Sequence, residues 1–306
     1  MVDNMQNQDM KDEIEIAFVG TGMMGAPMAR RLCGSPFTIR VWNRTLQKAL
    51  PLVEAGALLA SDVAEAAAGA DFVCLCLTDA EAVETALFGP PGLARALEPG
   101  MIVIDFSTIG PSATRDFASR IPATWLDCPV SGGVQGAQAG TLSIFAGGDP
   151  AAIERARPVL DRVGSRLTLM GPAGAGQAAK LCNQLLVSTQ LVAIAEAMAL
   201  AHHFRLRCEA LPDALQGGFA DSPLLRFFGP RMALAGIDGP PSGALETMAK
   251  DVALIQAEAA SRKMPLPLLE GVDRLYRAGI ARDLGSEPLE ALARLYREEM
   301  IDVAIR

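Results

Sequence analysis

The sequence has very little histidine, the residue on which many catalytic and metal sites depend. Its 306 residues include only two histidines, His202 and His203, which are adjacent. A histidine-centred triad or a multi-histidine metal site is therefore hard to build, and we expect no metal. The six cysteines form no CxxC pair, which favours free buried thiols in a reducing compartment over disulfides or zinc. Acid–base chemistry should therefore use another kind of side chain.

Charge and hydropathy exclude further classes of protein. The 27 basic residues are outnumbered by 35 acidic ones, and the net charge of -8 argues against a broad nucleic-acid surface. No stretch reaches about 18 uninterrupted apolar residues, so we expect no membrane span. Residues 1–13 are polar and acidic, which is unlike a signal peptide and predicts a flexible tail on a cytoplasmic protein. Half of the residues are hydrophobic, enough for a large folded core.

Short apolar runs alternate with helical patterns in the first half of the chain. Residues 14–19, 38–42, 72–77 and 101–104 are predicted strands. Continuously apolar strands separated by helices indicate a parallel sheet that is covered on both faces. The apolar residues around Trp125, at 142–145 and at 167–170 could extend this sheet. We therefore expect a Rossmann-type, doubly wound α/β domain over residues 14–172.

The pattern changes after Gly171. Residues 177–204 contain no Gly or Pro and predict one helix of about 28 residues, or about 42 Å. The rest of the chain shows helical periods, so we expect an all-α domain over residues 173–306 that this long interdomain helix joins to the first domain. Because the helix is apolar on every side, a partner subunit should complete its burial. The predicted assembly is a homodimer or homotetramer.

A glycine-rich motif follows the first predicted strand. Residues 20–25 read Gly-Thr-Gly-Met-Met-Gly and fit G-x-G-x-x-G at the point where a helix begins. In this context the glycines allow a tight turn and a close approach to a pyrophosphate. We expect Gly20, Gly22, Met23, Met24 and Gly25 to bind a dinucleotide, and the alternative is an ordinary glycine-rich turn.

The second predicted strand ends without the acidic residue that would bind the ribose hydroxyl of NAD. Asn43, Arg44 and Thr45 stand there instead. A guanidinium suits the 2′-phosphate of NADP, so we favour NADP, with NAD possible because Arg44 could stack on adenine without selecting phosphate. A solvated loop arginine is the simplest alternative.

Several motifs together resemble those of the β-hydroxyacid dehydrogenases, the group that contains 3-hydroxyisobutyrate dehydrogenase, tartronate semialdehyde reductase and the glyoxylate and succinic semialdehyde reductases. The matching segments are Gly20 to Gly25 with Pro27-Met28-Ala29, Asp105-Phe106-Ser107-Thr108, Asp127 to Gly133 with Gly136-Ala137 and Gly140-Thr141-Leu142, Gly174-Ala175-Gly176 with Lys180 and Asn183, and Lys250-Asp251. The resemblance implies the fold of 6-phosphogluconate dehydrogenase. Trp42 to Thr45 is most similar to the NADPH-using reductases of the group.

The resemblance implies roles for several of these residues. Lys180 would be the catalytic acid–base, and Asn183, which shares its helix face, would orient the substrate. Partial burial can lower the pKa of a lysine, which suits this role, although a lysine that extends from an apolar helix to solvent is the common alternative. Ser131, Gly132 and Gly133 would bind the substrate carboxylate through backbone amides, unless they form a plain loop.

Residues at the ends of two predicted strands are further cofactor candidates. The resemblance implies that Thr108 contacts the cofactor near the nicotinamide. Leu77 and Thr78 end another strand at an equivalent position, where ligands bind in open α/β sheets. Thr108 and the Leu77-Thr78 pair could instead be loop caps. Lys250 matches a second family lysine that reaches the cofactor, or is an ordinary exposed lysine.

These features predict an NAD(P)-dependent dehydrogenase or reductase that acts on CH–OH groups. It would interconvert a small β-hydroxyacid and its semialdehyde, of the 3-hydroxyisobutyrate, tartronate semialdehyde, glyoxylate or succinic semialdehyde class. The alternatives are a non-catalytic dinucleotide-binding scaffold and an imine reductase-like enzyme, both of which depart from the family at the catalytic lysine. Because Lys180 is present, we rank the alternatives below the dehydrogenase.

Overall fold

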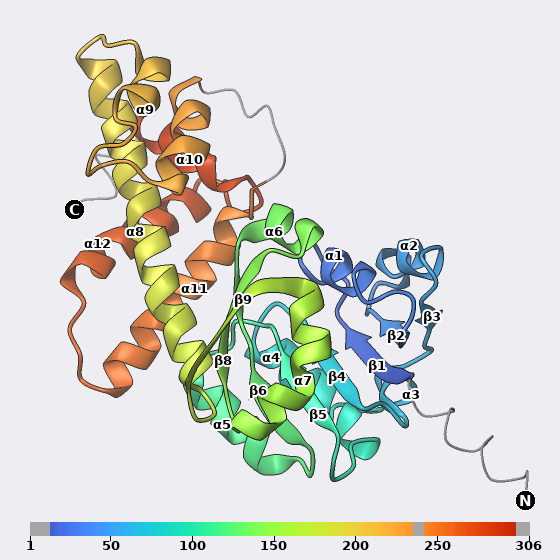
Figure 1. The fold of residues 1–306 in the computed structure, drawn as a ribbon. Helices are drawn as coiled ribbons and strands as arrows, with labels where there is room; N and C mark the ends of the chain where they lie inside the picture. The colour runs from blue at the N-terminus through green and yellow to red at the C-terminus, as the bar shows by residue number, and fades with distance from the viewer. Residues whose placement is uncertain (1–12, 235–241, 298–306) are drawn as a thin grey trace, which may run out of the picture. The chain divides into compact units, whose positions relative to one another are not determined.

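The computed structural model describes residues 13–234 and 242–297, so the expected flexible tail lies outside the described residues except for its last residue. The chain forms two compact units, one that ends at Lys180 and one that begins at Leu181. The first unit is an α/β domain and the second is helical, as the sequence predicts (Figure 1).

A nine-stranded sheet forms the centre of the first unit. Its parallel part consists of β1 (Ile14–Val19), β2 (Phe37–Trp42), β3 (Leu58–Leu59), β4 (Phe72–Leu75), β5 (Ile102–Asp105) and β6 (Thr124–Asp127). The remaining strands are β7 (Val130–Ser131), β8 (Leu142–Gly147) and β9 (Gly164–Gly171). The strand order is β3-β2-β1-β4-β5-β6-β8-β7, with β9 beside β8. The chain first adds β2 and β3 on one side of β1, and then adds β4 and the later strands on its other side. Open α/β sheets bind ligands at such a switch point, here between β1 and β4.

The far end of the sheet is mixed, whereas the sequence pattern indicates a parallel sheet. There β8 (Leu142–Gly147) runs antiparallel to β6 and β7 (Val130–Ser131), and β9 (Gly164–Gly171) runs parallel to β8. Residues 132–141 are too few for a parallel crossover, which needs about a dozen residues or more, so the chain returns antiparallel. Periodicity could not reveal this because buried strands of either direction have similar apolar runs.

Alternate residues of the strands supply two separate cores. In β1, Ile16 and Phe18 face one core, and Ala17 and Val19 face the other. The first core is covered by α1 (Gly25–Arg30), α2 (Leu50–Val53), α6 (Gly133–Ala139) and α7 (Pro150–Val163). The second core is covered by α3 (Val63–Ala67), α4 (Ala80–Phe88) and α5 (Pro111–Arg120). Burial on both faces explains why β4 and residues 102–104 of β5 are continuously apolar.

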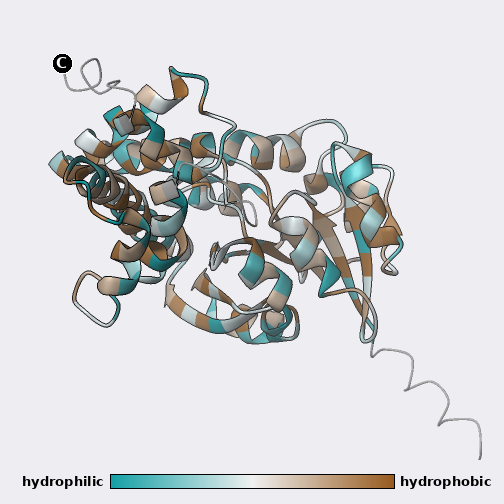
Figure 2. Cartoon of the chain, turned by 90° about the horizontal axis from the view of Figure 1, so that it is seen from above, coloured by the Kyte–Doolittle hydropathy of each residue, from teal (hydrophilic) through white to brown (hydrophobic). Residues whose placement is uncertain are grey.

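The predicted long helix is α8 (Ala175–His203), and further helices follow it. They are α9 (Leu211–Ala214), α10 (Pro223–Leu234), α11 (Leu245–Ser261), α12 (Pro267–Ile280) and α13 (Arg294–Arg297). Of the described helices, only α8 is long and apolar enough to cross a membrane by length and composition. Leu191, Ala195 and Met198 are buried in the hydrophobic core that α8 shares with α10, α11 and α12, so α8 contributes to the core of this unit. Figure 2 colours the chain by hydropathy and shows hydrophobic residues along both helices and strands.

Candidate active site

The glycine-rich loop lies between β1 and α1, as predicted. Gly20 has a φ of 98°, and a Cβ there would overlap the carbonyl oxygen of Cys76, which follows β4. A Cβ on Gly25 would overlap the carbonyl oxygen of Gly20. At Gly22, by contrast, a Cβ would meet nothing within 4 Å. Packing therefore requires glycine at positions 20 and 25, whereas Gly22 leaves open space beside the first turn of α1.

Two backbone donors follow Gly22 directly in the chain. The amides of Met23 and Met24 have no acceptor within the described ranges, and the side chain of Met23 is exposed. Amides in the first turn of a helix need such an acceptor and attract anions. The loop therefore fits the pyrophosphate of NAD(P), which would be held by the amides of residues 22–25.

Two glycine variants should separate packing from ligand binding. Gly25→Ala should destabilise the fold by about 1–3 kcal/mol, because the new methyl group overpacks against Gly20. Gly22→Ala should unfold near the wild-type temperature and yet bind NAD(P)H more weakly, because its methyl group occupies the open space. Thermal unfolding and cofactor titration of both variants test this. Equal cofactor affinity of Gly22→Ala and wild type would contradict the assignment of this space to the pyrophosphate.

The loop after β2 is tied to the glycine-rich loop by Asn43. Its Oδ1 accepts a hydrogen bond from the amide of Thr21 (2.9 Å), and its Nδ2 donates to the carbonyl of Thr45 (2.9 Å). Arg44 is exposed, and its guanidinium makes no hydrogen bond or ion pair with any residue that the structure describes. Asn43 therefore holds the two loops together, a role that sequence reasoning missed, and Arg44 is available to an anion beside them.

The loops after β4 and β5 are also joined. The amide of Leu77 donates to Oγ of Ser107 (2.9 Å), which links the segment bearing Thr78 to the segment bearing Thr108. Thr78 is exposed and Thr108 is half-buried. Because β1, β4 and β5 are parallel neighbours, these loops and the glycine-rich loop lie at the same edge of the sheet.

Two buried carboxyl groups lie at the ends of β5 and β6. Asp127 accepts hydrogen bonds from the amides of Gly174 and Gln177 (2.8 Å each) and so caps the start of α8. Burial raises the pKa of Asp127, and these hydrogen bonds oppose the rise. Asp105 accepts from the amide of Ser107 (2.9 Å) through Oδ1. Burial, with a smaller effect from the charge of Asp127, raises the pKa of Asp105 to about 7.

The raised pKa of Asp105 predicts that stability depends on pH. Between about pH 4 and the folded value of about 7, the unfolded chain has released this proton and the native chain has kept it. The free energy of unfolding therefore falls as the pH rises through this window. Asp105→Asn removes the titrating group and should show a smaller fall.

Urea unfolding of wild type and Asp105→Asn across this pH window measures the effect. The matched control is Asp213→Asn, which changes an exposed aspartate in the same way and should follow the wild-type curve. Parallel curves for wild type and Asp105→Asn would contradict the prediction.

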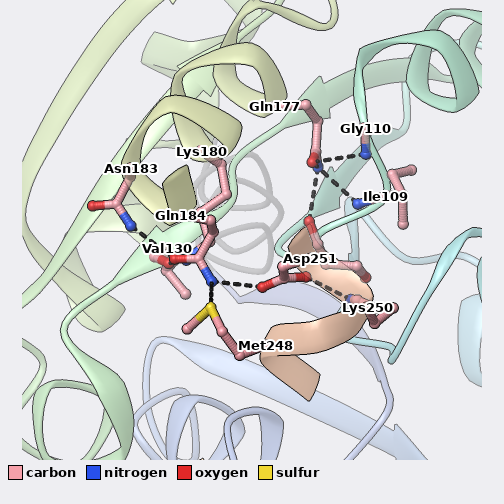
Figure 3. A network of polar contacts seen from close by, with 11 residues as sticks. Ile109, Gly110, Val130, Gln177, Lys180, Asn183, Gln184, Met248, Lys250 and Asp251 are labelled. Atoms are coloured by element: carbon pink, nitrogen blue, oxygen red, sulfur yellow. Dashed lines mark hydrogen bonds and ion pairs between the residues drawn. The ribbon is translucent and has the colours of Figure 1, made fainter. Parts of the chain in front are cut away.

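Lys180 lies beside the segment that the sequence predicts to bind a carboxylate. Its Nζ donates to the carbonyl of Val130 (2.8 Å), and only 9% of the residue is exposed (Figure 3). Val130 immediately precedes Ser131, and Gly132 and Gly133 both have positive φ and are exposed. The structure therefore brings together the predicted acid–base group and the predicted carboxylate-binding segment within the first unit.

Asn183 and Lys250 belong to one polar network in the helical unit. Nδ2 of Asn183 donates to Oε1 of Gln184 (2.8 Å), and Nε2 of Gln184 donates to Oδ2 of Asp251 (2.5 Å). Lys250 forms an ion pair with Oδ1 of Asp251 (3.0 Å) (Figure 3). In this chain Gln184 connects α8 to α11.

Comparisons with known proteins show the family to which this chain belongs. A family model described as the NAD binding domain of 6-phosphogluconate dehydrogenase matches residues 15–171. A second model, described as NAD-binding of NADP-dependent 3-hydroxyisobutyrate dehydrogenase, matches residues 174–296. The 3-hydroxyisobutyrate dehydrogenase of Pseudomonas aeruginosa is 34% identical over 293 residues, which are 92% of this chain and 98% of that protein. The chain belongs to the β-hydroxyacid dehydrogenase family.

Solved structures support the same conclusion. The 3-hydroxyisobutyrate dehydrogenase of Mycobacterium tuberculosis with L-serine is 32% identical, with a TM-score of 0.82 over 93% of this chain and 99% of that chain. Psf3 in complex with NADP+ and 2-OPP is 27% identical, with a TM-score of 0.81 over 92% of this chain and 99% of that chain. This β-hydroxyacid dehydrogenase is therefore an NAD(P)-dependent oxidoreductase that acts on the hydroxyl groups of hydroxyacids.

Proposed function

We propose that this β-hydroxyacid dehydrogenase prefers NADP(H) and interconverts a small β-hydroxyacid and its semialdehyde, with Lys180 as the acid–base. The observation that carries the proposal is the hydrogen bond from Lys180 to the carbonyl of Val130, next to Ser131. A buried ammonium group held beside exposed glycine amides can act on a hydroxyl group while those amides bind a nearby carboxylate.

The chain's residues have separate tasks in this reaction. A bound nicotinamide supplies or accepts the hydride. In the reducing direction, the Lys180 ammonium donates a proton to the carbonyl oxygen of the substrate. In oxidation, neutral Lys180 accepts the hydroxyl proton. The carbonyl of Val130 holds Nζ in place during both reduction and oxidation. Asn183 orients the substrate from the same helix.

The substrate class follows from this carboxylate recognition. Ser131 contributes a hydroxyl group, and Gly132 and Gly133 contribute amides without side chains, so the segment suits a small carboxylate. We propose the 3-hydroxyisobutyrate, tartronate semialdehyde, glyoxylate or succinic semialdehyde class. Relatives named 3-hydroxyisobutyrate dehydrogenase and 2-hydroxy-3-oxopropionate reductase support it.

A substrate screen tests the proposal directly. Each semialdehyde is offered with NADPH or NADH, each hydroxyacid with the oxidised cofactors, and absorbance at 340 nm is followed. We expect turnover of at least one compound of the class, with a higher kcat/KM for NADPH. Tight NADPH binding without turnover of any small carbonyl compound would favour the scaffold. Turnover of a cyclic imine alone would favour an imine reductase, a group to which neighbours at 17% and 21% identity relate this chain by fold alone.

The helical unit also has an open apolar groove that supports the predicted assembly. Residues of α8 and α12 and Tyr296 line it. Leu200 and Leu268 in this groove are 55% and 68% exposed, which is unusual for large apolar side chains that lie together. We propose that a second copy of the chain covers the groove, because a symmetric dimer buries the same face of both subunits.

Light scattering at micromolar concentration should then report at least a dimer for the wild type. Leu268→Glu should shift the protein toward monomer, because a carboxylate is costly to bury in an apolar interface. Leu58→Glu, which changes a similarly exposed leucine of β3 in the first unit, is the matched control and should leave the assembly unchanged. A monomeric wild type would contradict the proposal.

A further inference from the structure

A fully buried glutamine on α8 binds the loop that follows β5. Oε1 of Gln177 accepts hydrogen bonds from the amides of Ile109 (3.1 Å) and Gly110 (3.2 Å), and its Nε2 donates to the carbonyl of Ser107 (2.7 Å). None of its surface is exposed. Figure 3 shows the bonds from Gln177 to Ile109 and Gly110. The three bonds lie on either side of Thr108 in the chain, the residue that the family resemblance places near the nicotinamide.

Ser107 extends this network to the neighbouring strand. Its carbonyl accepts from Gln177, its hydroxyl accepts from the amide of Leu77 (2.9 Å), and its amide donates to Asp105 (2.9 Å). The side chain of Gln177 thus acts on the loops after both β4 and β5. Buried hydrogen bonds of this kind specify one arrangement, because an unmade bond leaves a buried polar group unpaired.

The backbone of Gln177 anchors the beginning of α8. Its amide donates to Asp127 (2.8 Å), which also accepts from Gly174. Lys180 is three residues further along the helix and therefore lies on the same face. Its Nζ is held by the carbonyl of Val130. One residue thus connects the loop bearing Thr108 with the helical turn that carries the proposed acid–base.

We propose that Gln177 is a positioning residue, which fixes the Thr108 loop relative to Lys180 and thereby aligns the nicotinamide with the proton donor. This inference rests on the proposed function of Lys180. Hydride and proton transfer to one carbonyl group both depend on alignment, and a displacement of about 1 Å can cost about 100-fold in rate.

The chemistry of the contact explains why the residue is glutamine. The site needs an acceptor for two amides and a donor for one carbonyl, and a side-chain amide supplies both from one group. Methionine has nearly the same length, but it has no donor and its sulfur is only a weak acceptor. A carboxylate supplies the acceptor, but it can donate to Ser107 only when it is protonated.

Two variants test the proposal through turnover. Gln177→Met should lower kcat by about 10- to 100-fold, with an increased kinetic isotope effect from deuterated NADPH and nearly unchanged NADPH affinity. Gln177→Glu should approach wild-type kcat at low pH and lose it as the pH rises, because burial raises the pKa of its carboxyl group and the protonated form replaces the amide. This variant also keeps the test open if Gln177→Met folds poorly.

Hydrogen exchange of the full-length protein without cofactor gives a readout that is independent of activity. Gln177→Met should increase exchange at the amides of Ile109 and Gly110, which lose their acceptor. The matched control is Gln190→Glu, which changes a partly exposed glutamine of the same helix and should alter neither exchange there nor kcat.

The outcomes separate this inference from the proposed function. Unchanged protection of Ile109 and Gly110 in Gln177→Met would overturn the inference, as would lost protection with wild-type kcat. A pH-independent kcat ratio between Gln177→Glu and wild type would also overturn it. If the wild type turns over no substrate, the proposed function fails, and exchange at the two amides still decides whether Gln177 holds the loop.

Discussion

Lys180→Ala is expected to lower kcat by about 100- to 10,000-fold, the usual contribution of a general acid–base. NADPH affinity should be nearly unchanged, because the proposed contacts of the cofactor with residues 20–25 and 43–45 do not involve this side chain. The reason for the loss is that the hydrogen bond from Nζ to the carbonyl of Val130 places a proton donor beside Ser131. Steady-state kinetics and NADPH titration measure the two effects separately.

Lys180→Gln refines this test, because a glutamine amide can still donate a hydrogen bond toward Val130 and cannot exchange a proton with the substrate. It should be nearly as inactive as Lys180→Ala. Lys263→Gln, at an exposed lysine that follows α11, is the matched control and should retain wild-type turnover. Near-wild-type kcat in either Lys180 variant would remove this residue from the mechanism.

Arg44→Ala should weaken NADPH binding by about 10- to 150-fold, because a hydrogen bond to a charged group contributes about 1.5–3 kcal/mol. NADH lacks the 2′-phosphate, so its affinity should change far less. The structure leaves the Arg44 guanidinium without a hydrogen bond or ion pair to any described residue, and Asn43 ties its loop to the glycine-rich loop. Both cofactors should be titrated at one fixed salt concentration, because ions screen a phosphate contact.

Arg95→Ala is the matched control for charge, since Arg95 is an exposed arginine of the same unit that lies outside the predicted cofactor site. It should leave both affinities unchanged. Equal losses of NADPH and NADH binding in Arg44→Ala would assign Arg44 to adenine stacking or to loop structure. Tighter binding of NADH than of NADPH to the wild type would overturn the NADP preference and leave the proposal for Lys180 intact.

Local sequence patterns predicted the elements that carry the site. Continuous apolar runs marked β4 and residues 102–104 of β5, because strands buried on both faces have no polar side to interrupt them. The glycine spacing marked the loop at residues 20–25, because a Cβ at Gly25 would overlap the carbonyl oxygen of Gly20 and a Cβ at Gly20 would overlap that of Cys76 after the neighbouring strand β4. A segment of 28 residues without Gly or Pro marked α8, which spans Ala175–His203.

The contacts that organise the site could not be read from these patterns. Gln177 looks like an ordinary polar residue of an apolar helix, and its partners are backbone groups nearly 70 positions away. Backbone amides and carbonyls are common to all residues, so no residue type signals such a partner. The only available signal was that Gln177 is polar and lies one helical turn before Lys180.

The sequence by itself determined the α/β and helical units and the glycine loop, because each depends on local spacing. The choice of Lys180 as acid–base candidate came from the family resemblance of the segment that contains it. Only the tertiary structure decided that Lys180 is held by Val130, that Asp127 caps α8 and that β8 runs antiparallel. It also joined Asn183 to Lys250 through Gln184 and Asp251. These contacts connect segments that are distant in the chain, and long-range packing selects them after the local elements have formed.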